Sequence, residues 1–238
     1  DVPDNTDTGI GEDGKKYAIR KKKIYGDPER IEAISKFIVD RLVSVVYPQI
    51  RRKAKAMLAV SSINSAIKYK GFIEKHFQEV TSLKKYEDFK DAPVYIVYSD
   101  SQEHVSSNSL NNGLNEKTVL QNFKLAKNGI VIVIDKLQTG FDEPKLHSLF
   151  LDKEIRGINA IQTISRVNRT TKYKNDCKII DFSYKNVNVK NIKEAFEHFS
   201  NVVVSDFDPL GDEARLEVLY KELKSHQIFQ EYFKDFKG

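Results

Sequence analysis

The sequence predicts an α/β fold in which a parallel β-sheet carries helices on both faces, with flanking helical segments. Its 238 residues include five short apolar runs, and stretches with apolar residues at helical spacing lie between them. Near-continuous apolar strands joined by helices are typical of parallel sheets that are buried on both faces. A hydrophobic content of 40% is sufficient for a large core.

The strands are expected at residues 56–61, 93–99, 129–135, 146–152 and 177–182. A first helix is expected to begin after Asp27, a capping residue followed by Pro28, and to extend to about Tyr47. Further helices are expected after the first strand, over 118–126, after the fourth strand and near 189–200. Residues 100–115 are rich in Ser and Asn, which predicts a mobile loop.

Composition divides the chain into three expected regions. Residues 1–26 are polar and rich in turn residues, so we expect a linker or an extended arm. Residues 27–205 hold the α/β domain. Residues 206–238 are rich in Glu, Lys and Leu, which predicts the start of a C-terminal helical region. Since the chain begins with Asp1 and linker-like residues, we expect it to be a piece of a larger protein.

The charge balance suits an anionic partner without requiring one, because 39 basic residues are interspersed with 34 acidic ones for a net charge of +5. The single cysteine, Cys177, excludes an internal disulfide framework. The sequence has neither a long apolar run nor a signal-peptide pattern. We therefore expect a cytoplasmic protein that does not associate with membranes.

One apparent nucleotide motif is excluded. The segment "GIGEDGKK", from Gly9 to Lys16, approaches the phosphate-binding loop G-x-x-x-x-G-K-[S/T]. However, Lys16 replaces the hydroxyl residue that would hold magnesium, no apolar strand precedes the segment, and two acidic residues would face the phosphates. We interpret the segment as part of the linker.

Three groups of residues are expected at the carboxyl edge of the sheet, where parallel α/β sheets bind ligands. The first is "KLQTGFDEP" (136–144), with Thr139, Gly140 and Asp142. The second is "QTISRVNRT" (162–170), where helical spacing would place Gln162, Arg166 and Arg169 on one face opposite an apolar side. The third comprises the hydroxyl residues that follow the first two strands: Ser61, Ser62 and Ser99.

Each group also has a purely structural explanation. The first could be an ordinary turn, the arginines could form a solvated helix face, and the serines could be helix caps. Asp135, Asp152 and Asp181 stand at strand ends, where an acid often satisfies local amides. The arginines, however, have the planar and permanently charged group that stabilises a transferred phosphoryl group.

Together these segments resemble a known family. "KAMLAVSSINSAIKY" (55–69), "VIVIDKLQTGFDEPKLHSLFLDK" (131–153) and "QTISRVNRT" are similar to motifs IV, V and VI of superfamily 2 helicases and translocases. More narrowly, the chain resembles the restriction (R) subunit of type I restriction–modification enzymes, over about residues 27–200. Ser165 departs from helicases at large, which more often have Gly before the first arginine of motif VI. The resemblance implies the second RecA-like motor domain of an ATP-dependent double-stranded DNA translocase.

By that resemblance, Arg166 and Arg169 would act on ATP as arginine fingers, with Arg169 the one nearer the transferred phosphate. Gln162, Gly140 and Asp142 would lie at the nucleotide. Thr139, Ser61, Ser62 and Ser99 would contact the DNA backbone, in line with the chemistry of hydroxyls at strand ends.

The resemblance also implies cofactors and partners. ATP with Mg²⁺ would be bound mainly by a preceding motor domain, since this chain has neither a phosphate loop nor a magnesium carboxylate. The partners would be double-stranded DNA, the methyltransferase and specificity subunits, and the motor and nuclease domains of the same polypeptide. No metal site is expected in this chain, and by itself it is expected to be inactive as an ATPase or nuclease.

Two other functions are compatible with parts of the sequence. One is a nucleic-acid-binding module without a role in ATP hydrolysis, which would bind phosphates through the basic residues at 20–23 and through Lys68, Lys70 and Lys75. The other is an unrelated α/β enzyme for a small molecule. The second is disfavoured because the turn after the first strand, "AVSSINSA", contains no glycine.

Overall fold

The computed structural model describes residues 23–98, 107–134 and 142–200. Contacts divide the chain into a unit of residues 1–195 and a unit of residues 196–238, and the sheet belongs to the first unit. None of the helices in the described ranges is both long and apolar enough to cross a bilayer.

Five parallel strands form one sheet in the order β2-β3-β1-β4-β5. The strands are β1 (Lys55–Val60), β2 (Val94–Tyr98), β3 (Ile130–Ile134), β4 (Leu146–Asp152) and β5 (Lys178–Asp181). The α-helices are α2 (Pro28–Arg41), α3 (Gln49–Arg52), α4 (Ile63–Thr81), α5 (Ser107–Leu110), α6 (Glu116–Leu125), α7 (Gly157–Val167) and α8 (Val187–Ser200). Shorter turns are the π-helical η2 (Leu42–Val46) and the 3₁₀ segments η3 (Lys84–Phe89) and η4 (Tyr184–Asn186).

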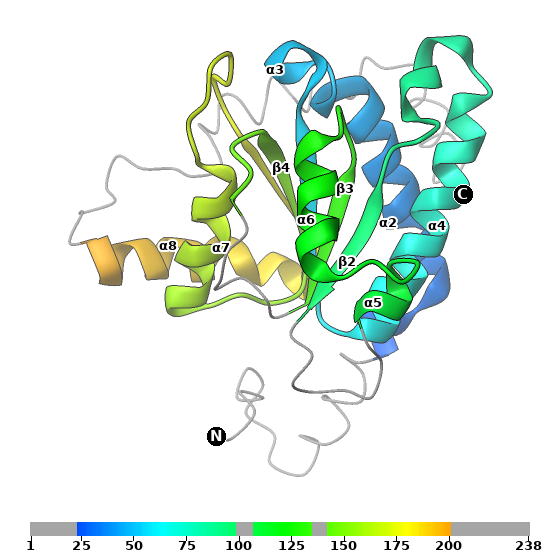
Figure 1. Ribbon diagram of the computed structural model, residues 1–238. Helices are drawn as coiled ribbons and strands as arrows, with labels where there is room; N and C mark the ends of the chain where they lie inside the picture. Colours follow the sequence, from blue (N-terminus) through cyan, green and yellow to red (C-terminus); the bar gives the residue numbers. More distant parts are fainter. Residues whose placement is uncertain (1–22, 99–106, 135–141, 201–238) are drawn as a thin grey trace, which may run out of the picture. The chain divides into compact units, whose positions relative to one another are not determined.

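Helices cover both faces of the sheet, as the sequence predicts (Figure 1). Helices α2 and α4 lie on one face, and α6 and α7 lie on the other. Every residue of β1, β3 and β4 is buried, because alternate side chains along each strand point into two separate apolar layers. Leu58 and Phe150, for example, belong to the layer under α2 and α4. The predicted parallel α/β fold is confirmed.

The first helix begins where the sequence predicts. Asp27 is its N-cap, and the side chain accepts a hydrogen bond of 2.8 Å from the backbone N–H of Arg30. The α-helix ends at Arg41, however, and the π-helical turn η2 continues it to Val46. The single α-helix expected to about Tyr47 is thus wrong in its last turn.

The loop expected over 100–115 is also partly wrong. Residues 107–110 form the short helix α5, and buried Asn111 follows it. The Asn111 amide accepts from the Ile96 N–H at 3.0 Å and donates to the Ile96 carbonyl at 2.7 Å. Because β2 is the edge strand of the sheet, this side chain satisfies backbone groups that would otherwise lack a strand partner.

One glycine is required by close packing. Gly129, before β3, has a φ of +129°, and a Cβ built there would lie 2.7 Å from the carbonyl oxygen of Pro93. The Pro93 carbonyl also accepts the Ile130 N–H at 3.0 Å, which starts the pairing of β2 with β3. A side chain at position 129 would separate these two segments.

Candidate functional site

The site is built around α7 and the segment that precedes β4. Helix α7 buries Ala160, Thr163, Ile164 and Val167 and leaves Gln162 and Arg166 partly exposed. It packs on β4. This separation of sides follows from the 3.6-residue period of the helix, and it agrees with the apolar and polar sides that the sequence predicts.

The structure corrects the position of Arg169. Helix α7 ends at Val167 and Asn168 is its C-cap, so Arg169 follows the helix instead of sharing a helical face with Arg166. The two arginines are nevertheless close enough for their charges to interact. Burial lowers the pKa of Arg166, the positive charge of Arg169 lowers it further, and the carboxylate of Asp142 opposes both effects.

Arg169 and Asp142 meet although 27 residues separate them in the chain. Nη1 of Arg169 donates to Oδ1 of Asp142 in an ion pair whose side chains are 39% and 57% exposed, respectively. The cluster of Arg166, Arg169 and Asp142 has two positive charges and one negative charge. Two planar guanidinium groups that are partly exposed to solvent suit an anion such as a phosphate.

The cluster does not lie at the edge of the sheet where the sequence analysis placed it. Asp142 precedes the amino end of β4, and Leu146 at that end is paired with Lys55, the first residue of β1. Helix α7 runs back across the sheet from the carboxyl end of β4, so its last turn reaches the amino edge. Ser61 and Ser62, by contrast, follow the carboxyl end of β1. The prediction that these groups gather at one edge is wrong.

The hydroxyl residues differ in their surroundings. Ser62 is the N-cap of α4, and its Oγ accepts from the N–H of Ser65 at 3.1 Å and lies 2.9 Å from the Ser65 hydroxyl. Ser61 is exposed. Ser99, Thr139 and Gly140 lie outside the described residues. Capping therefore accounts for Ser62, while Ser61 is accessible to a ligand at this end of β1.

Gln162 carries a buried acceptor. Its Oε1 atom has no hydrogen-bond partner among the described residues. A buried polar atom without a partner is costly, by roughly 1–3 kcal/mol, so this acceptor requires a donor that the described residues do not supply. Gln162 lies one helical turn before Arg166 on the same side of α7, so a ligand at the arginines would be near it.

A buried ion pair holds the segment that follows Asp142. The Lys55 ammonium contacts Oε2 of Glu143 at 2.8 Å, and the two side chains are 0% and 3% exposed, respectively. The same ammonium donates to the backbone carbonyls of Phe123 and Lys124. Burial lowers the pKa of Lys55, and the Glu143 carboxylate opposes this shift. Sequence reasoning missed this pair, although the sequence has a lysine at the start of an apolar strand and an acid in "FDEP".

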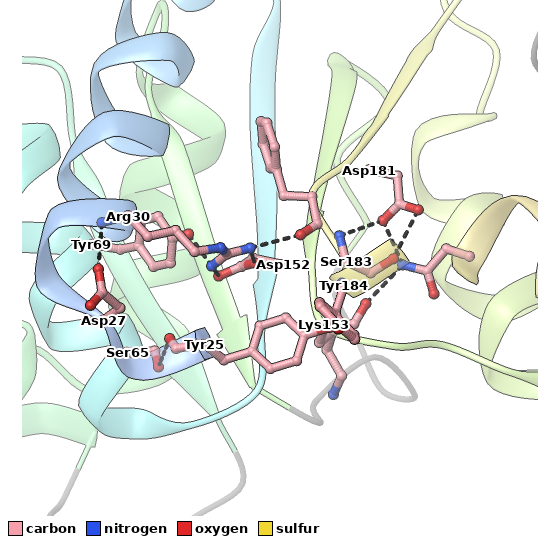
Figure 2. Close-up of polar contacts among 12 residues, drawn as sticks. Tyr25, Asp27, Arg30, Ser65, Tyr69, Asp152, Lys153, Asp181, Ser183 and Tyr184 are labelled. Atoms are coloured by element: carbon pink, nitrogen blue, oxygen red, sulfur yellow. Dashed lines mark hydrogen bonds and ion pairs between the residues drawn. The ribbon is translucent and has the colours of Figure 1, made fainter. Parts of the chain in front are cut away.

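A second polar network lies at the carboxyl edge of β4 (Figure 2). The fully buried Asp152 carboxylate accepts from Arg30 at 2.5 and 3.1 Å and from the Tyr69 hydroxyl at 2.7 Å. Arg30 also donates to the carbonyl of Phe182 at 2.7 Å. Helices α2 and α4 are thereby joined to the ends of β4 and β5. Burial, and then the Asp152 charge, raises the pKa of Tyr69.

The expectation for the strand-end acids is met by Asp181 and not by Asp152. Asp181 accepts a local amide, the Ser183 N–H at 2.9 Å, together with the Ser183 hydroxyl and the amide of Asn188. Asp152 instead takes its side-chain partners from distant helices, so the local explanation is wrong for it. Asp135 lies outside the described residues.

Comparison with known proteins identifies relatives. Residues 114–186 match a family model described as type I restriction enzyme subunit R domain 3. A putative type I restriction enzyme MjaVIIP endonuclease subunit from Methanocaldococcus jannaschii is 28% identical over 241 residues, with 91% of this chain and 22% of the relative covered. The type I restriction enzyme SauCOLORF180P endonuclease subunit from Staphylococcus aureus is 28% identical over 178 residues, with 65% and 19% covered. This chain thus spans about a fifth of the length of these relatives.

Solved structures with a similar arrangement include the second domain of the DEAD-box helicase Mss116p bound to an RNA duplex, at a TM-score of 0.45 and 16% identity. That alignment covers 76% of this chain and 58% of the helicase chain. The ATP-dependent type ISP restriction–modification enzyme LlaBIII bound to DNA aligns at a TM-score of 0.42 and 18% identity, over 74% of this chain and 13% of the enzyme.

Proposed function

We propose that this chain is the C-terminal motor domain of an ATP-dependent double-stranded DNA translocase, a proposal supported by the match of residues 114–186 to the family model for domain 3 of type I restriction enzyme R subunits. The observation that carries the proposal is the cluster of Arg166, Arg169 and Asp142. It joins two segments that the sequence separates and brings two guanidinium groups close together. Such a cluster is suited to bind and stabilise phosphate.

In this function Arg169 is the arginine finger. Asp142 accepts from Nη1, and a guanidinium has five N–H donors, so further donors remain for a phosphate oxygen. Arg166 adds a second positive charge beside it. The buried Oε1 of Gln162 would accept a hydrogen bond from the nucleotide or from a group bound beside the nucleotide. Arginine fingers raise the rate of phosphoryl transfer by roughly a thousandfold or more.

The rest of the machinery would come from the parent protein. Mg²⁺ would be held by the nucleotide phosphates and by a preceding motor domain, and this chain alone would hydrolyse neither ATP nor DNA. Its partners would be double-stranded DNA and the methyltransferase and specificity subunits of a cytoplasmic restriction–modification complex. Ser61 and the segment with Thr139 would face the DNA backbone. This chain covers about a fifth of its relatives, so those relatives have further regions in which such machinery could lie.

The contacts of two of the three lysines weaken the alternative of a nucleic-acid-binding module. Lys68 donates to the carbonyl of Gly26 at 2.6 Å, and Lys70 donates to the carbonyl of Leu110 at 2.7 Å. Lys75 pairs with Glu32 at 2.7 Å. The ammonium groups of Lys68 and Lys70 are therefore held in partly buried contacts within the protein, whereas the Lys75 pair is exposed and leaves N–H donors for a phosphate. Residues 20–22 of the basic run lie outside the described residues.

The test is DNA-stimulated ATP hydrolysis by the intact parent chain, wild type against Arg169→Ala. We expect kcat to fall by roughly a thousandfold while binding of duplex DNA is unchanged. Arg156→Ala is the matched control, because Arg156 is the N-cap residue of the same helix and is 46% exposed. Equal turnover in wild type and Arg169→Ala would refute the motor assignment and favour the binding module.

A further inference from the structure

Lys174 lies in the connection between α7 and β5, and its ammonium is surrounded by backbone carbonyls. Nζ contacts the oxygens of Val167 at 2.5 Å, Leu146 at 2.6 Å, Arg169 at 2.8 Å and Pro144 at 3.3 Å. The side chain is partly buried. Burial lowers the pKa of Lys174, and the charges of Cys177, Asp176 and Glu143 oppose this shift.

A lysine suits this arrangement for geometric reasons. An ammonium has three N–H donors that rotate freely, so it can serve oxygens that converge from several directions, whereas the planar fork of arginine cannot. Val167 is the last residue of α7, and its carbonyl is one of those that the helix leaves unsatisfied. A positive charge there also interacts favourably with the helix dipole.

The four oxygens belong to two segments that both lead to the cluster of Arg166, Arg169 and Asp142. Pro144 and Leu146 follow Asp142, while Val167 and Arg169 form the end of α7 and the turn after it. The Lys55–Glu143 pair fixes the first segment to the core on its other side. Lys174 therefore joins the segment next to Asp142 to the backbone of Arg169.

We propose that Lys174 is a positioning residue: its ammonium holds the backbone of Arg169 at a fixed place beside Asp142, so that the guanidinium is preorganised for phosphate. This inference rests on the proposed function, since it assigns to Lys174 an effect on ATP hydrolysis that is exerted through Arg169. Lys174 does not itself contact the nucleotide. A misplacement of a reacting group by about 1 Å can lower a rate roughly a hundredfold.

The experiment compares wild type, Lys174→Met, Arg169→Ala and the double variant in the intact parent chain. Methionine keeps much of the length of the side chain and removes the donors. For Lys174→Met we expect kcat for DNA-stimulated ATP hydrolysis to fall by about a hundredfold, with KM for ATP within about twofold, because the arginine finger acts mainly in the transition state. Lys172→Met is the matched control, since Lys172 is exposed two residues away, and it should retain wild-type kinetics.

The double variant separates positioning from a merely structural role. If Lys174 acts through Arg169, Lys174→Met should add little to the loss that Arg169→Ala already causes. Two independent effects would multiply instead, and that result would overturn the inference. Lys174→Gln retains two N–H donors and keeps the test open if Lys174→Met does not fold. A folded Lys174→Gln protein whose loss of kcat multiplies with that of Arg169→Ala would also overturn the inference.

The two proposals fail in different ways. If Arg169→Ala itself retains full turnover, the proposed function is wrong. If Arg169→Ala loses turnover while Lys174→Met matches Lys172→Met, the motor assignment stands and only the positioning role of Lys174 is refuted.

Discussion

Replacing Arg30 with methionine should destabilise the protein strongly, because it leaves the Asp152 carboxylate without its charged partner. Asp152 is fully buried and accepts two hydrogen bonds from Arg30 and one from Tyr69. Breaking a buried ion pair from one side costs about 3–5 kcal/mol. The Arg30 side chain is 23% exposed, so water can reach part of the vacated site, and we expect a value near the lower end, about 3 kcal/mol.

Urea unfolding of the chain, followed by far-ultraviolet circular dichroism, measures this loss. With a denaturant slope of about 2 kcal/mol/M, a loss of ~3 kcal/mol moves the midpoint down by about 1.5 M. Arg41→Met is the control, since Arg41 lies on the same helix, is exposed, and lies over the Phe37 ring in an arrangement worth about 0.5 kcal/mol. The double variant Arg30→Met/Asp152→Asn should recover part of the loss. An Arg30→Met midpoint no lower than that of Arg41→Met would refute the reasoning.

Three further predictions concern stability. Lys55→Met should cost about 3–5 kcal/mol of unfolding free energy, because it leaves the buried Glu143 carboxylate without its charged partner. The double variant Lys55→Met/Glu143→Gln should cost less than the single change. Equal losses of the two variants in urea unfolding would contradict this. Burial lowers the pKa of His147 below 6.5, so the unfolded chain binds the proton first and the free energy of unfolding should fall as the pH drops below about 6.5. His147→Gln should lose less stability than wild type between pH 7 and 5. The same dependence of stability on pH in both proteins would disprove this. Gly129→Ala should lower the melting temperature by several degrees through its clash with the Pro93 carbonyl, and an unchanged melting temperature would show that the segment can shift.

Local patterns in the sequence were enough for most of the fold. The five apolar runs coincide with β1 to β5 to within about one residue at most ends. Strands that are buried on both faces, as β1, β3 and β4 are, have to be largely apolar. The Asp27-Pro28 start of α2 was predictable for a similar reason, since a helix N-cap depends on neighbouring residues alone. The π-helical turn η2 and the helix α5 were not predictable, because tertiary packing outweighs propensity in such short segments.

The candidate site was predictable in its residue types but not in its arrangement. Arg166, Arg169 and Asp142 could be selected from the chemistry of arginine and from the family resemblance. Their meeting at the amino edge of the sheet could not, since it depends on the direction in which α7 crosses β4 and on where that helix ends.

By itself, then, the sequence determined the parallel α/β fold, the start of α2 and the choice of residues for the proposed phosphate site. These follow from burial periodicity and from side-chain chemistry, which act over a few neighbouring residues. The tertiary structure decided the partners: Arg30 with Asp152 across 122 residues, Lys55 with Glu143 across 88, and the ammonium of Lys174 with the carbonyls of two separate segments. A buried charge is stable only where the folded chain brings its partners to it, so no local pattern can predict such a pairing.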